Sequence, residues 1–395
     1  MTRALCPYVC CILFGNGKNM AISLTSRQLL FLRLHSQRLV SRFAVEPAQV
    51  VKAVCGIQAQ ALSAAELAVG LRSSALTQAD VKRARLQERS IIWSWGMRGT
   101  LHLIAASDMT WLLPLVGPAY LAGDRKRSLQ LGLDEETAAN GVRFLTDLLS
   151  NQGPQTRGEI AVQLAAQGIP TQGQASIHLI ARAAAQGLVC HGPERLGEPS
   201  YVLFKDWCKD AIYTSAMPVE AALEELARRY LAAYGPASAA DLAAWSGLSQ
   251  RELRPALARI ADELVEVETA GNPSWLPKSH LGWLDEPASF EQAPTPLVRL
   301  LPRFDIYLLG YAGRESILAP DFSSRINAGG GMIAASLLVD GRIQGTWRTK
   351  KRRDALDVIV APFGELSAEV WAALETEVAA LGRFLGVKAV LGGAQ

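Results

Sequence analysis

The sequence predicts an α+β protein in which tandem winged helix-turn-helix units are followed by a small antiparallel β-barrel and a C-terminal helix. Two observations carry this prediction. Helical patterns followed by strand-like runs occur three times, in residues 23–150, 151–215 and 216–276. In residues 277–395, prolines and short β-type runs replace the helices, and one amphipathic helix follows near the end.

The composition is that of an ordinary soluble globular protein. The 395 residues are 49% apolar and 19% charged, which leaves room for two to four domains with sizeable cores. Because the formal charge is only +3, any surface for nucleic acid must come from local clustering of cations. Six cysteines without a Cys-x-x-Cys pair indicate neither a disulfide framework nor a zinc site, and they favour a reducing compartment.

Residues 1–22 are expected to form a disordered tail or to derive from an upstream start codon. The apolar run 6–14 resembles part of a signal peptide, but it is too short to span a membrane and no small-residue cleavage pattern follows it. A second methionine, Met20, directly precedes the first convincing helix. These residues are therefore set aside in the fold prediction.

The first unit, which opens with a helix from Ser26, contains a polar corner between two further helices. Pro47 opens the helix before this corner, and Gly56 stands where such a helix ends in a left-handed residue. Ser63-Ala64-Ala65-Glu66 has the form of a capping box for the helix after it. The segment between them, Gly56-Ile57-Gln58-Ala59-Gln60, is therefore expected to be presented at the surface.

The first unit continues with a helix near Thr77 and a hairpin. Strand-like runs at 91–95 and 100–104 flank Gly96-Met97-Arg98-Gly99, which has the glycines of a hairpin turn. Residues from Asp108 to about Ser150 are expected to be helical, with breaks at two prolines, Pro114 and Pro118.

The second and third units repeat this order with few shared residues. For the second, we expect helices at 156–165 and 174–186 and strands at 188–191 and 201–203. For the third, we expect an amphipathic helix at 219–234, helices from Pro236 and Ser249, and a strand at 264–268. A proline-rich linker is expected after Pro273, marked by Pro277, Pro287, Pro294 and Pro296.

The C-terminal part is predicted to be a small barrel or curled sheet covered by a helix. Asp340-Gly341 is a hairpin turn. The final helix is expected at about Ala368 to Leu385. The strand-like runs are 298–301, 307–311, 332–339, 343–348 and 355–360.

Gln58 and Gln60 are the candidate catalytic pair, because two carboxamides separated by one residue of extended chain project in similar directions. Most such pairs are ordinary surface residues, so the motif alone is weak. His102 lies on a strand beside Thr100 and is expected to face this corner. No Ser-His-Asp arrangement, metal-ligand spacing, phosphate-binding loop or dinucleotide fingerprint is present.

The densest charge cluster is Thr349-Lys350-Lys351-Arg352-Arg353, at a turn between two strands. With Trp347 and Arg348 just before it, this turn is suited to a DNA groove, where cations neutralise phosphates. The alternative is a turn that is kept soluble by its charge. Arg98 is a further candidate for a phosphate contact.

The chain resembles the winged-helix DNA glycosylases of the AlkZ/YcaQ type over nearly everything after Met20. Their catalytic motif is Gln, an apolar residue, then Gln or Asp, and here it is Gln58-Ala59-Gln60. At Ile306 the sequence departs from the family, in which an acidic residue is common. The segments that carry the resemblance are Gly56-Ile57-Gln58-Ala59-Gln60-Ala61, Trp95-Gly96-Met97-Arg98-Gly99-Thr100-Leu101-His102, 300–311 and 339–348.

The resemblance implies an enzyme that hydrolyses the N-glycosidic bond of alkylated purines and unhooks certain interstrand crosslinks, with Gln58 and Gln60 as catalytic residues. It implies no cofactor or metal and no membrane partner. The partner is double-stranded DNA carrying alkylated bases, bound by a monomer in the cytoplasm or on the nucleoid. The DNA-binding residues expected on these grounds are Arg98, Thr100, His102, Trp347, Arg348, Lys350, Lys351 and Arg352.

An uncharged pair of glutamines limits the chemistry. A carboxamide has no useful pKa, but its carbonyl oxygen can hold a water and face a developing oxocarbenium ion. A purine alkylated at N3 or N7 already carries positive charge and needs no strong acid to leave. Two alternatives remain: a non-catalytic winged-helix regulator or architectural protein, and a helical scaffold without DNA affinity.

Overall fold

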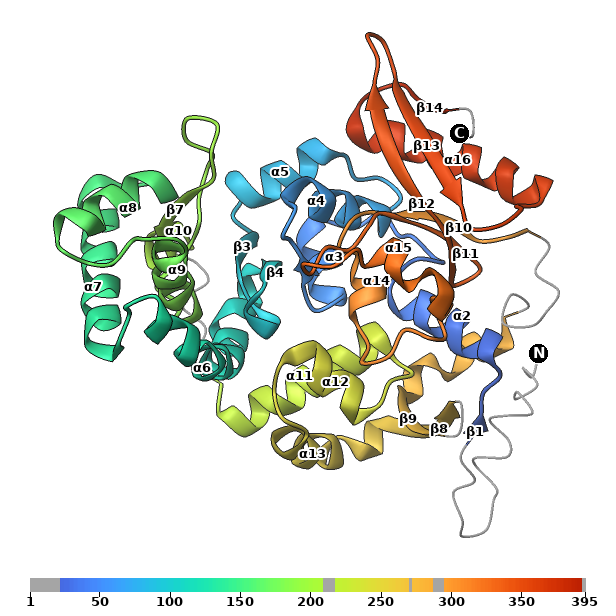
Figure 1. Ribbon diagram of the computed structural model, residues 1–395. Coiled ribbons are helices and arrows are strands. Elements are labelled where there is room, and N and C mark those ends of the chain that lie inside the picture. The colour runs from blue at the N-terminus through green and yellow to red at the C-terminus, as the bar shows by residue number, and fades with distance from the viewer. Residues whose placement is uncertain (1–21, 209–216, 270–271, 287–294, 393–395) are drawn as a thin grey trace.

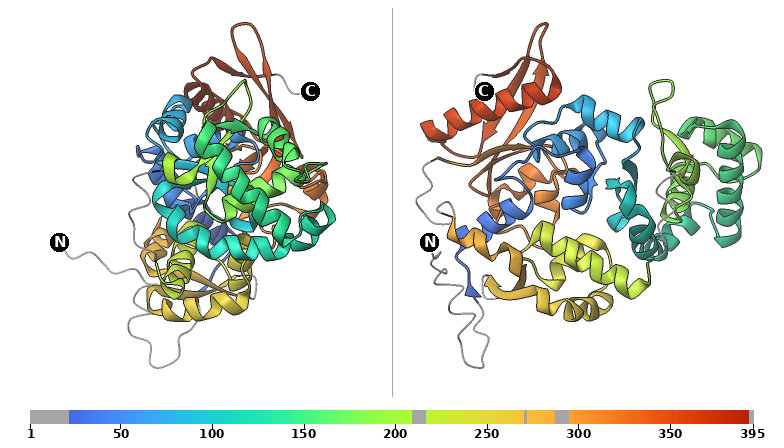
Figure 2. Two further views of the ribbon diagram at one scale, coloured as in Figure 1. Left: turned by 90° about the vertical axis from the view of Figure 1, so that its left-hand side faces the viewer. Right: turned by 180° about the vertical axis from the view of Figure 1, so that it is seen from behind.

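The computed structural model describes residues 22–208, 217–269, 272–286 and 295–392, so the predicted tail lies outside the described residues apart from Ile22. The fold is mixed α/β, with three three-stranded sheets and one five-stranded sheet in these ranges. Figures 1 and 2 show the second unit as a lobe at one end of the molecule and the five-stranded sheet with its long helix at the other. Within the described ranges, no helix is long and apolar enough to cross a membrane.

The first unit surrounds a sheet of order β2-β4-β3. Pro47 begins α3, and Thr77 caps α5 through Asp80, as predicted. The capping box predicted at Ser63 is wrong, because α4 begins two residues earlier than a cap at Ser63 requires, and its N-cap, Ala61, has no side chain that can accept a hydrogen bond. The elements are α2 (Ser26–Ser36), α3 (Pro47–Ala53), β2 (Ile57–Gln58), α4 (Leu62–Leu71), α5 (Gln78–Leu86), β3 (Ile91–Trp95), the 3₁₀ turn η1 (Met97–Gly99) and β4 (Leu101–Ala105).

The breaks predicted at Pro114 and Pro118 are wrong. Helix α6 (Ala106–Gln130) runs through both prolines. Its N-terminal half, from Asp108 to Gly117, is largely buried, and a Cβ at Gly117 would overlap the backbone of Ala185 in the second unit. Several buried apolar side chains, each contributing about 1.5–3 kcal/mol, outweigh the cost of about 3 kcal/mol that an interior proline imposes on a helix.

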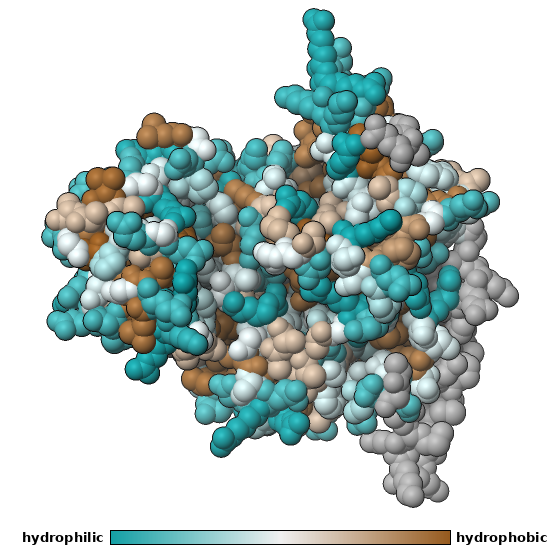
Figure 3. Space-filling view, viewed as in Figure 1, coloured by the Kyte–Doolittle hydropathy of each residue, from teal (hydrophilic) through white to brown (hydrophobic). Residues whose placement is uncertain are grey.

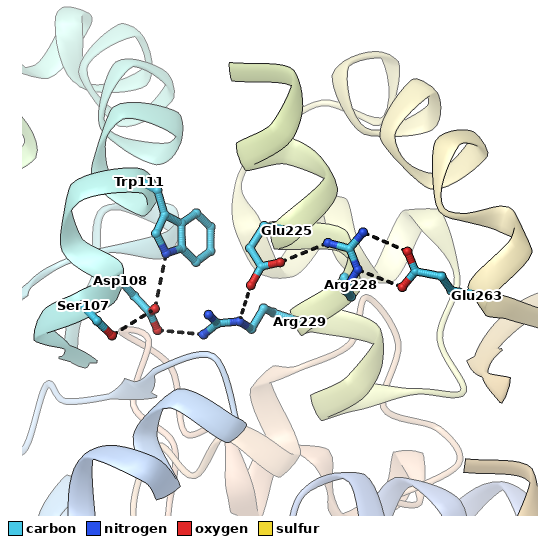
Figure 4. Close-up of polar contacts among 7 residues, drawn as sticks. All are labelled: Ser107, Asp108, Trp111, Glu225, Arg228, Arg229 and Glu263. Atoms are coloured by element: carbon cyan, nitrogen blue, oxygen red, sulfur yellow. Dashed lines mark hydrogen bonds and ion pairs between the residues drawn. The ribbon is translucent and has the colours of Figure 1, made fainter. Parts of the chain in front are cut away.

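A chain of ion pairs joins α6 to the third unit (Figure 4). Asp108 accepts hydrogen bonds from Trp111 of the same helix and from Arg229 of α11 (Val219–Tyr234), at 3.3 and 3.0 Å. Glu225 bonds both Arg229 and its neighbour Arg228, which also pairs with a glutamate of the 3₁₀ turn η3 (Ala261–Glu263). The network fixes the position of α11 beside the first unit.

The second unit follows the predicted order of helices and strands, with a sheet of order β5-β7-β6. It meets the first unit through stacked rings, because His191 lies against Trp93 with ring centroids 3.8 Å apart. Tyr201, of the second unit itself, packs on His191 at a tilt with ring centroids 4.6 Å apart. Helix α7 (Glu135–Gln152), from the helical extension of the first unit, packs into the core of the second unit. The elements of the second unit are β5 (Gln155–Thr156), α8 (Arg157–Ala166), α9 (Ala175–Ala185), β6 (Val189–His191), β7 (Ser200–Leu203) and α10 (Phe204–Trp207).

The third unit packs α11 with two shorter helices and a sheet of order β1-β8-β9. The linker predicted from Pro273 is wrong in its first part, because Pro273 and Pro277 lie within the edge strand β9, where proline is tolerated. Two of the predicted linker prolines, Pro287 and Pro294, lie outside the described residues. The remaining elements are β1 (Ile22–Ser23), α12 (Ala239–Ser246), α13 (Gln250–Arg259), β8 (Leu264–Thr269), β9 (Asn272–Pro277) and the 3₁₀ helix η4 (Lys278–Asp285).

The C-terminal part is a curled five-stranded sheet, of order β10-β11-β12-β13-β14, with α16 packed on it. All pairs are antiparallel except β13 with β14, a short strand that the sequence pattern did not reveal. Helix α16 has the predicted bounds. The elements are β10 (Val298–Leu301), α14 (Ile306–Leu309), η6 (Pro320–Phe322), α15 (Ser323–Ile326), β11 (Ser336–Val339), β12 (Arg342–Lys351), β13 (Leu356–Pro362), α16 (Ala368–Leu385) and β14 (Ala389–Leu391).

The strand predicted at 307–311 is wrong, because its first residues belong to helix α14. The run is buried on all sides, and a continuous apolar run does not distinguish a buried strand from a buried helix. Asp305, the N-cap of α14, forms two hydrogen bonds of 2.7 and 2.9 Å with Arg72 at the end of α4. Both side chains are fully buried, so this pair ties α4 to the C-terminal part.

Candidate active site

The corner that contains the two glutamines is an extended segment held by three backbone-directed contacts. In β2, Ile57 pairs with Leu103 of β4 and Gln58 pairs with His102. The pairing continues past the strand, because the Ala59 amide donates to the Leu101 carbonyl at 2.6 Å. On its other side, Trp93 donates to the Ala59 carbonyl at 3.2 Å. The prediction that the segment 56–60 is presented at the surface is wrong except for Gln60, because the other four residues are buried and only Gln60 is exposed.

The turn into the corner requires glycine at position 56. Helix α3 ends at Ala53, and both Cys55 and Gly56 follow with positive φ, 55° and 96°. A Cβ at position 56 would lie 3.1 Å from the Cε of Met97. The predicted left-handed residue is therefore present, although the turn uses two such residues where the pattern suggested one.

Arg98 binds Gln58 directly. Its Nη2 donates to Oε1 of Gln58 at 2.8 Å, and its Nη1 donates to the carbonyl of Trp245, the penultimate residue of α12, at 2.5 Å. Burial lowers the pKa of Arg98, and within the described residues no carboxylate is bonded to it. The sequence placed Arg98 near the glutamines, but it gave no signal for the contribution of α12.

The turn that carries Arg98 is wedged between two helices. Arg98 itself has a left-handed φ of 56°. A Cβ at Gly99 would overlap the ring of Tyr120 in α6, and a Cβ at Gly247, just after α12, would lie 3.3 Å from the Arg98 backbone. The Arg98 guanidinium is therefore attached to a turn whose backbone has little room to move.

His102 is buried and uncharged. Its Nδ1 lies 2.9 Å from the carbonyl oxygen of Thr100, which can only accept, so Nδ1 carries the proton. Burial, followed by the charge of Arg98, lowers the pKa of His102 to about 3. The hydroxyl of Thr100 donates to the Met97 carbonyl at 3.0 Å. These two predicted DNA-binding side chains thus shape the turn around Arg98.

Gln60 differs from Gln58 in its surroundings. Gln58 is 8% exposed, whereas Gln60 is exposed to solvent. In the part of the chain that the structure describes, the amide nitrogen of Gln58 and the whole side chain of Gln60 have no hydrogen-bond partner. One glutamine is therefore fixed and the other is free.

Two hollows lie near this corner, although neither glutamine lines them. Arg98 lines a cavity of about 360 Å³ together with Tyr120 and Asp124, whose carboxylate is held by Ser128 and His178. A larger groove of about 730 Å³ begins at Ser63, three residues after Gln60, and runs between α4, α16 and the curled sheet. Trp347 and Arg348 lie in its wall.

The basic turn lies on a different part of the molecule. Lys350 and Lys351 end β12, Arg352 follows in the turn, and all three are exposed. Trp347, half-buried at the base, donates to the Leu301 carbonyl at 2.8 Å. The tip of the β12–β13 hairpin is a hydrophilic projection in Figure 3. Among the described residues, none of Lys350, Lys351, Arg352 and Trp347 is hydrogen-bonded to either glutamine, so these predicted DNA-binding residues form a group apart from Arg98, Thr100 and His102.

Comparisons with known proteins show which proteins the chain as a whole is similar to. The family model described as DNA glycosylase AlkZ-like matches residues 51–384. An interstrand DNA cross-link repair glycosylase from Streptomyces sahachiroi is 30% identical over 380 residues, which are 91% of this chain and 96% of the relative. The solved structure of the Streptomyces sahachiroi DNA glycosylase AlkZ matches with a TM-score of 0.80 and 27% identity, over 95% of this chain and 100% of that chain.

Proposed function

The chain belongs to the AlkZ-like DNA glycosylases, enzymes that hydrolyse N-glycosyl bonds, and we propose that it removes purines alkylated at N3 or N7 from double-stranded DNA. The observation that supports this substrate class is that, among the described residues, the corner holds no strong acid or base: its carboxamides do not titrate, and the Arg98 guanidinium is a cation that can only donate. In the described part of the chain, no carboxylate is bonded to Gln58, Arg98 or His102. A site without a strong acid or base suits a leaving group that is already charged.

The chemistry follows from the charge of the lesion. The electron pair of the bond between C1′ and the purine nitrogen passes to the cationic ring, which leaves as a neutral base. A water oxygen forms the new bond to C1′, and its proton passes to solvent. A glutamine carbonyl aligns this water and faces the oxocarbenium-like transition state with the negative end of its dipole. An unmodified purine would leave as an anion and would need a proton donor that a carboxamide cannot replace.

Interstrand crosslinks are the second part of the proposal. The Streptomyces sahachiroi relative is named for repair of such crosslinks, and its similarity spans nearly the whole of both chains. Gln60 is exposed in this structure, so a bulky lesion does not have to enter a closed pocket to reach it. We extend the activity to crosslinks formed through N7 of purines on this basis.

DNA binding is assigned to the basic hairpin and to the three helix-and-hairpin units, which we propose act as winged-helix modules of one monomer. The β6–β7 and β12–β13 hairpins project from the same side of the molecule in Figure 1. Lys350 and Lys351 are exposed at the second of these, where they are free to neutralise backbone phosphates. The unit boundaries stay those predicted from the sequence.

The test is release of N7-methylguanine from duplex DNA, with a nitrogen-mustard crosslink in parallel. The wild-type protein is expected to release the base, and Gln58→Ala and Gln60→Ala to reduce the single-turnover rate at least about 100-fold, as for loss of one transition-state hydrogen bond. Gln152→Ala, at an exposed glutamine ending α7, is the control and should match the wild type. Binding to undamaged duplex without any release would favour the non-catalytic alternative.

A further inference from the structure

The orientation of the Gln58 carboxamide is determined by chemistry. A guanidinium has five N–H donors and no acceptor, so the group that meets Arg98 at 2.8 Å must be the carbonyl oxygen of Gln58. The NH₂ group then points to a different side of the planar amide. In the described residues this NH₂ has no partner.

Arg98 is well suited to impose this orientation. Both terminal nitrogens of its guanidinium are engaged, Nη2 with Gln58 and Nη1 with the Trp245 carbonyl. Its backbone is confined between the ring of Tyr120 and the Gly247 turn. Since no carboxylate is bonded to it within the described ranges, its positive charge polarises the Gln58 amide, drawing negative charge to the oxygen and leaving the NH₂ as the positive end.

We propose that Arg98 is a positioning residue that makes Gln58 a hydrogen-bond donor toward the lesion-bearing nucleotide, while Gln60 supplies the acceptor oxygen for the attacking water. This deepens the proposed function and rests on it. Gln60 takes the second role because its side chain is exposed and because, among the described residues, no cation is bonded to it. The acceptor that Gln58 meets is an oxygen or nitrogen of the damaged nucleotide. The two glutamines of the motif thus have opposite polarity.

The first arm of the test measures orientation without activity. Gln58→Glu places a carboxylate against Arg98, and Gln60→Glu places one in solvent. In the Arg98→Met background, the carboxylate at position 58 loses its counter-ion in a buried site and becomes destabilising. The expected result is a Tm penalty for Gln58→Glu that is larger by about 3 °C or more in the Arg98→Met background than in the wild type. Gln60→Glu should shift Tm equally in both. Equal penalties for Gln58→Glu would overturn the orientation.

The second arm measures the chemical step by single-turnover release of N7-methylguanine. Gln58→Glu keeps the size and the Arg98 contact but cannot donate, so its rate should fall about 100-fold or more. Gln60→Glu replaces the amide oxygen with a carboxylate, a stronger acceptor that faces a cationic transition state. Its single-turnover rate should therefore rise. A faster Gln58→Glu and a slower Gln60→Glu would reverse the assignment.

A double-substitution cycle separates positioning from general support of the fold. Arg98→Met should reduce the single-turnover rate but should have little further effect once Gln58→Ala is present, because Arg98 acts through Gln58. Additive losses would mean that Arg98 acts independently and would refute the positioning role. If the wild type releases no base, the proposed function fails, and the Tm cycle still decides the orientation.

Discussion

Acid should destabilise the contact between the first and second units through His191. The ring is buried between Trp93 and Tyr201, and burial lowers its pKa to about 3, compared with 6.5 in an unfolded chain. Below pH 6.5, His191 therefore binds a proton in the unfolded state but not in the folded state. The contribution of His191 to the free energy of unfolding is fully present above pH 6.5 and is lost progressively as the pH falls from 6.5 toward 3.

The magnitude follows from the two pKa values. Each pH unit between them costs about 1.36 kcal/mol for one histidine, so lowering the pH from 7.5 to 5.0 should cost about 2 kcal/mol through His191. His102, also buried with a pKa of about 3, should add a similar loss in the first unit. The wild type is therefore expected to lose about 4 kcal/mol from these two rings over this interval.

The assay is urea unfolding at pH 7.5 and 5.0, followed by tryptophan fluorescence, because Trp93 stacks on His191. His191→Phe keeps an aromatic ring but cannot titrate, so its loss of stability between the two pH values should be smaller than that of the wild type by about 2 kcal/mol. Tyr201→Phe keeps His191 and should retain the full loss. An equal loss in His191→Phe and in the wild type would refute the reasoning.

Two further predictions concern the charges. Arg72→Met should destabilise the protein by about 3–5 kcal/mol in urea unfolding, because the fully buried carboxylate of Asp305 loses both hydrogen bonds to Arg72; a loss under about 1 kcal/mol would contradict this. Replacing Lys350 and Lys351 by Gln should weaken binding to all duplex sequences alike and reduce the slope of log K against log salt by about 2, measured by fluorescence anisotropy. An unchanged slope would show that the hairpin does not contact phosphates.

Local sequence signals predicted most elements because the physics that determines them is local. Helix α16 has the predicted bounds, since its amphipathic pattern begins after Ser367, which caps it, and ends at Gly386 in a left-handed conformation. The polar corner was located by Pro47 and Gly56 in the same way. Where tertiary burial competes with local preference, the prediction failed, as for the continuous helix through Pro114 and Pro118.

The candidate site shows the same division between local and tertiary information. The sequence predicted Gln58 and Gln60 as a pair. It could not show that Arg98 holds the Gln58 carboxamide while Gln60 has no partner among the described residues, because Arg98 is itself held by a carbonyl of α12, which is distant in sequence. Position 306, where this chain has isoleucine and the family commonly has an acidic residue, is a second example. Ile306 is buried, while the residue before it, Asp305, supplies a buried acid that binds Arg72.

The neutral motif acquires its polarity from elements far away in the chain. Two identical side chains cannot differ in chemistry unless their surroundings differ, and here the difference is one partly buried cation on a turn that Tyr120 and Gly247 confine. Because Arg98 can only donate, it fixes the negative end of Gln58 and leaves Gln60 as the unengaged carbonyl of the motif. In the proposed mechanism, a glutamine pair that is nearly symmetric in sequence is thereby divided into a donor toward the lesion-bearing nucleotide and an acceptor for the attacking water.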